Sequence, residues 1–269
     1  MTSGADRPAR QSPVADSIAA FLLLSRLPAG WYRFPDDRPP DFTSATWAFP
    51  LVGLVIGAFG GAALGLAAMA GLPPLAAAAI CLLVMTLLSG AMHEDGLADM
   101  ADGFGGGHDV ESRMRIMHDS RIGSYGVLAL ILATALRLSL LMVCLEMFGL
   151  TDLILFMAMI VAASRFQPVL QLAVFPLSPH ARLAMLTGRP GTGRLILALA
   201  LWVPGLVWLT GIEAAATTAV PALAASLWIG ATSVRRVEGL TGDVMGATTI
   251  IAEIIMLMCW TTAGSMLAA

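Results

Sequence analysis

The sequence predicts an all-α, polytopic integral membrane protein: a bundle of about seven transmembrane helices with an interfacial helix at its N-terminus. Hydrophobic residues make up 58% of the 269 residues and charged residues only 12%, whereas soluble domains carry about a quarter charged residues. The mean hydropathy is +0.82. Seven apolar runs approach the roughly 20 residues that a spanning helix needs. They cover residues 47–70, 75–92, 124–145, 153–175, 195–211, 214–232 and 244–266.

The chain divides into a cytoplasmic N-terminal segment, residues 1–46, and a single transmembrane catalytic domain, residues 47–269. In the first part, Ser12 and Pro13 form a plausible helix start. The residues from Val14 to Leu27 mix apolar and polar positions, which predicts an amphipathic helix that lies in the membrane interface. Prolines and aspartates between residues 30 and 46 predict a polar loop.

The arginines indicate which side of the membrane each segment occupies. The chain has no lysine, and all but two of its 15 basic residues fall in segments that are cytoplasmic if the N-terminus is cytoplasmic. Because cytoplasmic loops are enriched in basic residues, we expect the motif loop, residues 93–123, to face the cytoplasm. The arginines of this side are Arg7, Arg10, Arg26, Arg33, Arg38, Arg113, Arg115, Arg121, Arg182, Arg189, Arg194, Arg235 and Arg236.

The first span carries a stripe of glycines at Gly53, Gly57, Gly61 and Gly65. Residues four apart lie on one face of a helix, and a bare face lets another helix approach closely. Tight packing inside the bundle is the favoured interpretation. A homo-oligomer interface is the alternative.

Three aspartates in the stretch HEDGLADMADG, residues 93–103, have helical spacing. If the second span continues as a helix through this stretch, Asp95, Asp99 and Asp102 project from one face. Glu94 points about 100° away from Asp95. Stacked like charges repel one another and are costly near hydrocarbon, so a divalent cation bound by carboxylate oxygens would compensate for them. We expect Mg²⁺, with Mn²⁺ as the alternative metal, while a solvated acidic helix end is the structural alternative.

A glycine-rich loop with several arginines follows at residues 103–126. It lacks the ending of a P-loop, so the glycines alone do not indicate a nucleotide site. Arg113 and the compact run Asp119, Ser120 and Arg121 face the same compartment as the aspartates, and arginine suits two-point contacts with phosphate. Ordinary loop arginines are the alternative. The histidines lack metal-ligand spacing, and loop or helix-cap roles are expected for His93, His108 and His118.

Two arginines lie inside predicted spans, Arg137 in the third and Arg165 in the fourth. A charge within the membrane marks either a buried ion pair or a functional site. Two alternatives stay open at this point: the arginines pair with acids of the protein, or they contact phosphate in a polar cavity.

The stretch GLTGDVMGATTIIAE, residues 239–253, adds two acids on the last predicted span. Asp243 opens this span near the cytoplasmic face, and Glu253 lies about 15 Å further along the helix. Gly242 and Gly246 permit the close approach of another helix. Asp243 is therefore a candidate ligand or base, and Glu253 is a candidate metal ligand.

Clustered carboxylates, cytoplasmic arginines and a membrane cavity together predict metal-assisted phosphoryl transfer. A CDP-alcohol phosphotransferase is one alternative, although its D-G-x-x-A-R motif is not met here: Asp95 and Gly96 are followed by Leu97, Ala98 and Asp99, without the arginine. A cation transporter predicts acids spread through the depth of several spans, whereas most acids here lie on one side. A purely structural subunit leaves the aspartates unexplained. The expected partners are small molecules and the lipid bilayer, with no nucleic acid.

Three ordered motifs resemble those of the cobalamin synthase family, the adenosylcobinamide-GDP ribazoletransferases. The motifs are H-x-D-G-L-A-D-x-x-D-G at 93–103, D-S-R-I-G at 119–123 and T-G-D-x-x-G-A at 241–247. The resemblance begins with LLSRLPAG at 23–30 and ends near Glu253, so it covers nearly the whole chain. Glu94 departs from the family pattern, in which a variable, often apolar residue is expected.

The resemblance implies a reaction and a cofactor. The 3′-hydroxyl of α-ribazole, or of α-ribazole 5′-phosphate, attacks the cobinamide-side phosphorus of adenosylcobinamide-GDP, and GMP leaves. Such enzymes require Mg²⁺. The implied metal ligands are Asp95, Asp99 and Asp102, one of which could act as the base. The further candidates are Asp119 and Asp243 as ligands or base, Glu253 as a metal ligand, and Arg113, Ser120, Arg121, Arg137 and Arg165 as phosphate contacts.

Overall fold

The computed structural model describes residues 12–34, 39–181 and 187–268, with side chains as far as residue 262. Within these ranges the chain is helical apart from turns, loops and one isolated bridge between Leu177 and Leu240. Four arginines that favour a cytoplasmic N-terminus lie outside the described residues: Arg7, Arg10, Arg38 and Arg182. The helices are α1 (Pro13–Leu24), α2 (Phe42–Ala45), α3 (Phe49–Met69), α4 (Pro74–Ser89), α5 (Met92–Gly106), α6 (Val110–Met117), α7 (Ser124–Met147), α8 (Leu150–Val174), α9 (Thr192–Ala200), α10 (Val203–Thr210), α11 (Ile212–Val237) and α12 (Gly242–Ala268).

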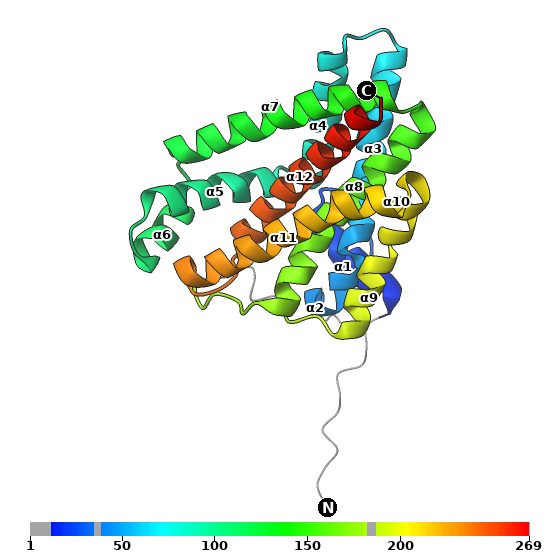
Figure 1. The fold of residues 1–269 in the computed structure, drawn as a ribbon. Helices are drawn as coiled ribbons and strands as arrows, with labels where there is room; N and C mark the ends of the chain where they lie inside the picture. Colours follow the sequence, from blue (N-terminus) through cyan, green and yellow to red (C-terminus); the bar gives the residue numbers. More distant parts are fainter. Residues whose placement is uncertain (1–11, 35–38, 182–186, 269) are drawn as a thin grey trace, which may run out of the picture.

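Long apolar helices confirm the predicted membrane bundle (Figure 1). Among the described residues, six helical segments are long and apolar enough to cross a membrane, and a seventh is added if α4 and α5 form one bent span. The fifth predicted span is interrupted, because α9 and α10 are separated at Leu201 and Trp202. The six segments are Phe42–Met69, Ser124–Met147, Leu150–Val174, Thr192–Thr210, Ile212–Val237 and Gly242–Thr262.

The N-terminal helix begins where the sequence predicts. Ser12 caps α1, since its Oγ accepts a hydrogen bond from the backbone N–H of Ala15 at 3.2 Å. The helix ends at Leu24 instead of Leu27 because Ser25 turns to extended backbone. One side of α1 is buried against the bundle, where Trp47 donates a hydrogen bond to the Asp16 carboxylate at 3.0 Å.

The prediction of an unbroken loop over residues 30–46 is wrong at its end. Asp41 caps the short helix α2, and its Oδ1 accepts hydrogen bonds from the backbone N–H groups of Thr43 and Ser44. A single 3₁₀ turn, Thr46–Ala48, then leads into α3. An aspartate among polar residues reads as loop in sequence, yet here it starts a helix by satisfying the first free N–H groups.

The glycine stripe of α3 packs inside the bundle, as favoured. A Cβ atom on Gly53 would lie 2.6 Å from the Cα of Ala162, and one on Gly61 would lie 2.9 Å from the Cα of Ile154. Only glycine therefore lets the backbones of α3 and α8 approach this closely. All four glycines are buried, so the stripe is occupied by α8 and the alternative of a homo-oligomer interface through it is wrong.

The second predicted span does not continue through the acidic stretch. The helix ends at Ser89, and α5 leaves it at an angle of 90°. Gly90 (φ 70°) and Ala91 (φ 59°) both adopt left-handed backbone, a conformation that costs a residue with a side chain about 1–2 kcal/mol. The N–H of Ala91 bonds to the carbonyl oxygen of Thr86 at 3.0 Å, which closes the end of α4. The acidic residues thus belong to a separate helix that can face α12.

The connections between helices lie on different sides of the bundle (Figure 1). The turns from α3 to α4 and from α7 to α8 lie at the upper right of the view, α6 and the turn from α11 to α12 lie at the left, and α2 lies at the bottom. Arg115 of α6 and the arginines in the last turn of α11, Arg235 and Arg236, belong to the left side. The predicted sidedness in the membrane stays a prediction.

Candidate functional site

The acidic helix α5 and the start of α12 cross at a pair of glycines. A Cβ atom on Gly96 would lie 2.7 Å from the backbone oxygen of Asp243, and one on Gly246 would lie 3.4 Å from the Cα of His93. The first distance leaves no room for a side chain, so Gly96 permits the close approach of the two helices. This contact confirms the interpretation that these glycines allow a helix to come near, and it brings two motifs that are far apart in sequence together.

Beside this crossing lies a cavity of about 320 Å³. Asp95 from α5 and Asp243 from α12 both line it, so the structure brings these two predicted site residues together. Asp243 stands in the first turn of α12, where Thr241 accepts a hydrogen bond from the N–H of Val244 at 3.2 Å. Carboxylates are favourable at the N-terminus of a helix. The remaining lining residues are Leu23, Leu24, Phe49, Met92, His93, His118, Pro168, Leu172, Ala181, Thr187, Thr241, Gly242, Met245, Gly246 and Thr249.

Asp99 lies one helical turn beyond Asp95 and is half-buried. The negative charges of Asp95, Asp243 and Asp102 all act on it, which places it at the edge of the same acidic cluster. In the described part of the chain, no group of three or more His, Cys, Asp and Glu side chains is positioned to hold a metal ion together. The cluster thus presents carboxylates to the cavity without a closed protein cage around a metal.

Asp102 turns away from the cavity and holds the start of α7. Its two carboxylate oxygens accept hydrogen bonds from the backbone N–H groups of Gly123 at 2.7 Å and Gly126 at 2.9 Å. A Cβ atom on either glycine would collide with this carboxylate. The glycine that ends the D-S-R-I-G motif is therefore explained by its contact with the last aspartate of the first motif. Helical spacing predicted that Asp102 binds a metal together with Asp95 and Asp99. In the structure, its carboxylate instead contacts the start of α7.

Asp119 and Arg121 pair with each other on the exposed loop before α7. Arg121 Nη2 lies 2.8 Å from Asp119 Oδ2, and the Arg121 side chain is 88% exposed. The hydrogen bonds from Arg121 lower the pKa of Asp119 to about 2. A carboxylate with so low a pKa is a weak proton acceptor near neutral pH, so the pair suits anion contact better than base catalysis. Ser120, between them, is exposed.

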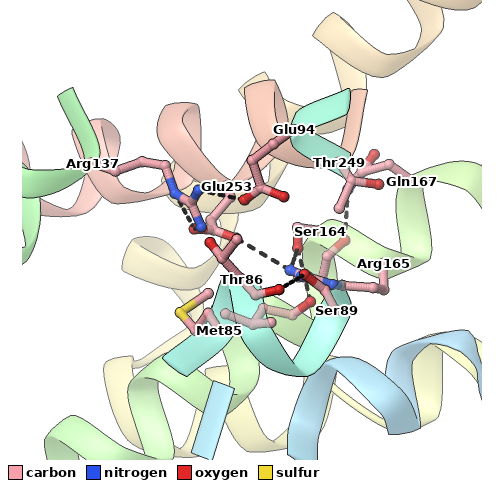
Figure 2. A network of polar contacts seen from close by, with 12 residues as sticks. Met85, Thr86, Ser89, Glu94, Arg137, Ser164, Arg165, Gln167, Thr249 and Glu253 are labelled. Carbon is pink, nitrogen blue, oxygen red and sulfur yellow. Dashed lines mark hydrogen bonds and ion pairs between the residues drawn. The ribbon is translucent and has the colours of Figure 1, made fainter. Parts of the chain in front are cut away.

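The two intramembrane arginines form a buried network with two glutamates (Figure 2). Arg137 Nε donates a hydrogen bond to Glu253 Oε1 at 2.9 Å, and Arg137 Nη1 donates to Glu94 Oε1 at 3.0 Å. Arg165 Nη1 donates to Glu253 Oε2 at 3.2 Å and to Ser164 at 2.9 Å. The two arginines and Glu253 are buried, and the four formal charges sum to zero. Such pairing is what makes buried charges tolerable.

This network decides between the two alternatives for the intramembrane arginines. They pair with acids of the protein, and both oxygens of Glu253 are bonded to arginines. The expectation of Glu253 as a metal ligand, and of Arg137 and Arg165 as phosphate contacts, is therefore not favoured by their contacts. Sequence reasoning missed that Glu94 bonds to Arg137 and thereby ties α5 to α7.

Arg113 also hydrogen-bonds to groups of the protein itself. Its Nη1 donates to the backbone oxygen of Arg236 at 3.2 Å and its Nη2 to that of His108 at 3.1 Å. Arg236 in turn donates to the backbone oxygen of Phe104 at 2.7 Å. These contacts fasten α6 and the end of α5 to α11, so Arg113 is held within the protein instead of projecting toward a phosphate.

His93 is the site residue that sequence reasoning misplaced. The structure places it inside α5, 2% exposed and lining the cavity, whereas a loop or cap role was expected. Its Nδ1 has no hydrogen-bond partner among the described residues. The signal available in the sequence was its place as the first residue of the H-x-D-G motif, two residues before Asp95.

Comparisons with known proteins agree with the motifs. The family model described as cobalamin-5-phosphate synthase matches residues 16–261. The chain is 39% identical to the adenosylcobinamide-GDP ribazoletransferase of Azorhizobium caulinodans, over 91% of this chain and 94% of that protein. It is 36% identical to the protein of that name from Bradyrhizobium diazoefficiens (91% and 92% covered) and 35% identical to the one from Brucella ovis (93% and 97% covered).

No solved structure matches the chain. The match to the family model covers all three motifs and the crossing of α5 with α12, so it includes every residue that lines the cavity. The chain belongs to the cobalamin-5-phosphate synthase family of membrane-embedded transferases.

Proposed function

We propose that this protein transfers α-ribazole, or its 5′-phosphate, to adenosylcobinamide-GDP and releases GMP, as the names of its relatives describe for them. One observation carries the proposal beyond similarity. Asp95 and Asp243, from motifs 148 positions apart (243 minus 95), line one cavity at the end of the bundle. Two carboxylates beside a cavity are suited to phosphoryl transfer, which depends on positioning and on compensation of charge.

The reaction forms one phosphorus–oxygen bond and breaks another. The ribose 3′-oxygen of the acceptor attacks the cobinamide-side phosphorus, the bond from that phosphorus to the bridging oxygen of GMP breaks, and GMP leaves with that oxygen. The hydroxyl proton passes to a carboxylate at the cavity edge. Asp99 is our candidate for this acceptor because it is half-buried beside the charges of Asp95 and Asp243, and proximity of acids makes a carboxylate more basic.

The donor set fits a hard divalent cation. Asp95 and Asp243 face one cavity, and among the described residues that line it there is no arginine to compensate for them. Mg²⁺ commonly binds through one or two carboxylates and completes its shell with water and substrate phosphates, which suits a site without a closed cage of side chains. When bound by Asp95 and Asp243, Mg²⁺ or Mn²⁺ would neutralise charge on the reacting phosphates. Asp102, bonded to Gly123 and Gly126, would position the cluster.

The protein is proposed to lie in the bacterial inner membrane with the cavity opening toward the cytoplasm. Arg115 of α6 and Arg235 and Arg236 at the end of α11 belong to elements on the same side of the bundle as the start of α12 (Figure 1). Basic residues favour the cytoplasmic side, where soluble phosphorylated substrates are found.

A reconstituted assay tests the proposal. Full-length protein in liposomes is incubated with adenosylcobinamide-GDP, α-ribazole or its 5′-phosphate, and Mg²⁺, and GMP and the completed corrinoid are quantified. We expect product with wild type, and a loss of at least a hundredfold in kcat/KM in Asp95→Asn and Asp243→Asn, since removal of a charge-compensating group in phosphoryl transfer costs about 10³-fold or more. Asp109→Asn, an exposed helix cap on α6, is the matched control. Full activity in Asp95→Asn would overturn the site, and no product with wild type would overturn the reaction.

A further inference from the structure

We infer that the cavity beside Asp95 and Asp243 binds the benzimidazole base of ribazole, with its ribose toward the two carboxylates, and that His93 hydrogen-bonds this nucleoside. The inference rests on the proposed function and deepens it, because it states which of the two substrates enters the cavity, in which orientation, and through which contact.

The cavity extends along the first turns of α12. Its lining residues on this helix run from Gly242 to Thr249, a rise of seven residues, or about 10 Å of helix. Where α5 crosses α12, Gly96 lies against the backbone of Asp243, and Gly246 lies against the backbone of Met92, His93 and Gly96. Along α12, Asp243 therefore lies near one end of the lining and Thr249 lies at the other.

The lining of the cavity suits an uncharged aromatic group. The apolar lining residues include Leu23 and Leu24 of α1, Phe49 of α3 and Leu172 of α8. Among the described lining residues, the ionisable side chains are Asp95, Asp243, His93 and His118. Apolar walls with a few placed polar groups are typical of small-molecule sites.

Size separates the two substrates. A volume of about 320 Å³ is at the lower end of the range for small-molecule sites, which is about 300–1,000 Å³. A benzimidazole nucleoside is of this scale, whereas a corrinoid ring carrying an adenosyl group is several times larger. With the base at the apolar end, the ribose of the same nucleoside reaches Asp95 and Asp243, where its 3′-hydroxyl must react.

The His93 side chain has a ring nitrogen that could hydrogen-bond to a ligand in the cavity. It is 2% exposed, lines the cavity, and its Nδ1 has no hydrogen-bond partner among the described residues. A buried nitrogen without a partner destabilises a protein unless a ligand or water satisfies it. A benzimidazole nucleoside offers both ring nitrogen and ribose hydroxyl groups, so it can satisfy an imidazole in either tautomer.

The first test fills the end of the cavity at Thr249, away from Asp243. Thr249→Leu adds volume next to the base, and Thr262→Leu is the matched control, because both threonines lie on α12 and donate to the carbonyl oxygen four residues before them. Thr262 is exposed and does not line the cavity. We expect the KM for α-ribazole to rise about tenfold or more in Thr249→Leu, the effect of a steric mismatch in a pocket, with the KM for adenosylcobinamide-GDP unchanged. An unchanged KM for α-ribazole, or an increase only for the corrinoid, would overturn the inference.

The second test probes His93. His93→Phe keeps the ring shape and removes the hydrogen bond, and we expect the KM for α-ribazole to rise about tenfold, equivalent to one hydrogen bond. His93→Asn places an amide near the position of Nδ1 and should restore most of the loss, which a merely structural role of the ring would not explain. Equal kinetics of wild type and His93→Phe would exclude the proposed contact.

Direct binding keeps this inference separate from the proposed reaction. Equilibrium dialysis of α-ribazole against full-length wild type and Thr249→Leu, with neither corrinoid nor turnover, reports occupancy of the cavity alone. Binding by wild type and by Thr262→Leu, but not by Thr249→Leu, supports the inference even if no transfer product is formed. Equal binding by all three proteins, or no binding by wild type, would refute it. If Thr249→Leu cannot be purified, Thr249→Ala should raise the relative binding of a ribazole analogue with a bulkier base, and no change would count against the cavity.

Discussion

Glu253 accepts a hydrogen bond from the Nε of Arg137 at 2.9 Å, although 116 residues separate them, and its second oxygen bonds to Arg165. Figure 2 shows these side chains with Glu94 at the junction of α5, α7, α8 and α12. Because Glu94 immediately precedes Asp95, this charge-neutral network fixes the orientation of the helix that carries the acidic cluster.

Glu253→Gln is expected to destabilise the protein strongly. The substitution removes the carboxylate that both arginines share and leaves one uncompensated buried positive charge, which costs about 3–5 kcal/mol. Glu146→Gln, at an exposed position of α7, should change stability by less than about 0.5 kcal/mol. Thermal unfolding in detergent measures both. Equal unfolding temperatures for the two variants would show that the network contributes nothing to the fold.

Gly123→Ala should disrupt the contact between Asp102 and the start of α7. A Cβ atom at Gly123 would collide with the Asp102 carboxylate, whereas one at Gly149 would meet nothing within 4 Å. Both glycines precede a helix, α7 and α8 respectively, with negative φ angles, so the two substitutions differ mainly in this contact. We expect a loss of about 1–3 kcal/mol for Gly123→Ala and little change for Gly149→Ala. Chemical or thermal unfolding in detergent measures the stability of both variants. The prediction fails if the two variants have the same free energy of unfolding.

Gly96→Ala should reduce activity by separating the two carboxylates of the cavity. The added methyl group would press on the backbone of Asp243 at 2.7 Å, and a displacement of about 1 Å in a reacting group can cost about a hundredfold in rate. Gly106→Ala is the control on the same helix, because its methyl group would make only an ordinary contact with Ile116 at 3.5 Å. The measurement is kcat/KM in liposomes. Retention of full activity in Gly96→Ala would show that the crossing of α5 and α12 does not set the reacting geometry.

Arg121→Gln should raise the pKa of Asp119 from about 2 toward the ordinary value of an aspartate, about 3.9. The native pKa lies below that of the unfolded chain, so the stabilisation from this pair is present above about pH 4 and is lost as the pH falls toward 2. The check is an NMR titration of carbon-labelled aspartate, with Asp119→Asn to assign the signal. Arg115→Gln, an exposed arginine of α6, should leave the titration of Asp119 unchanged, and a similar shift in both variants would contradict the specific pairing.

The sequence by itself determined the fold class and most of the spans. These properties depend on local composition, because a run of about 20 apolar residues can only be accommodated as a helix in lipid. The first helix could be placed from Ser12 and Pro13 for a similar reason, since a cap acts on N–H groups within three residues. Motif order was sufficient to indicate the family, and it placed Asp95 and Asp243 among the site candidates.

Only the tertiary structure decided how the charged residues are shared between the cavity and the scaffold. Helical spacing predicted that Asp95, Asp99 and Asp102 share one face. In the structure, the break at Gly90 and Ala91 turns α5 against α12. The Asp102 carboxylate accepts hydrogen bonds from the backbone N–H groups of Gly123 and Gly126. Whether Glu253 meets a metal or an arginine depends on which helices are neighbours, and so does the burial of His93. The physical reason is that charge pairing acts over a few ångströms between helices, and no periodicity along the chain records those distances.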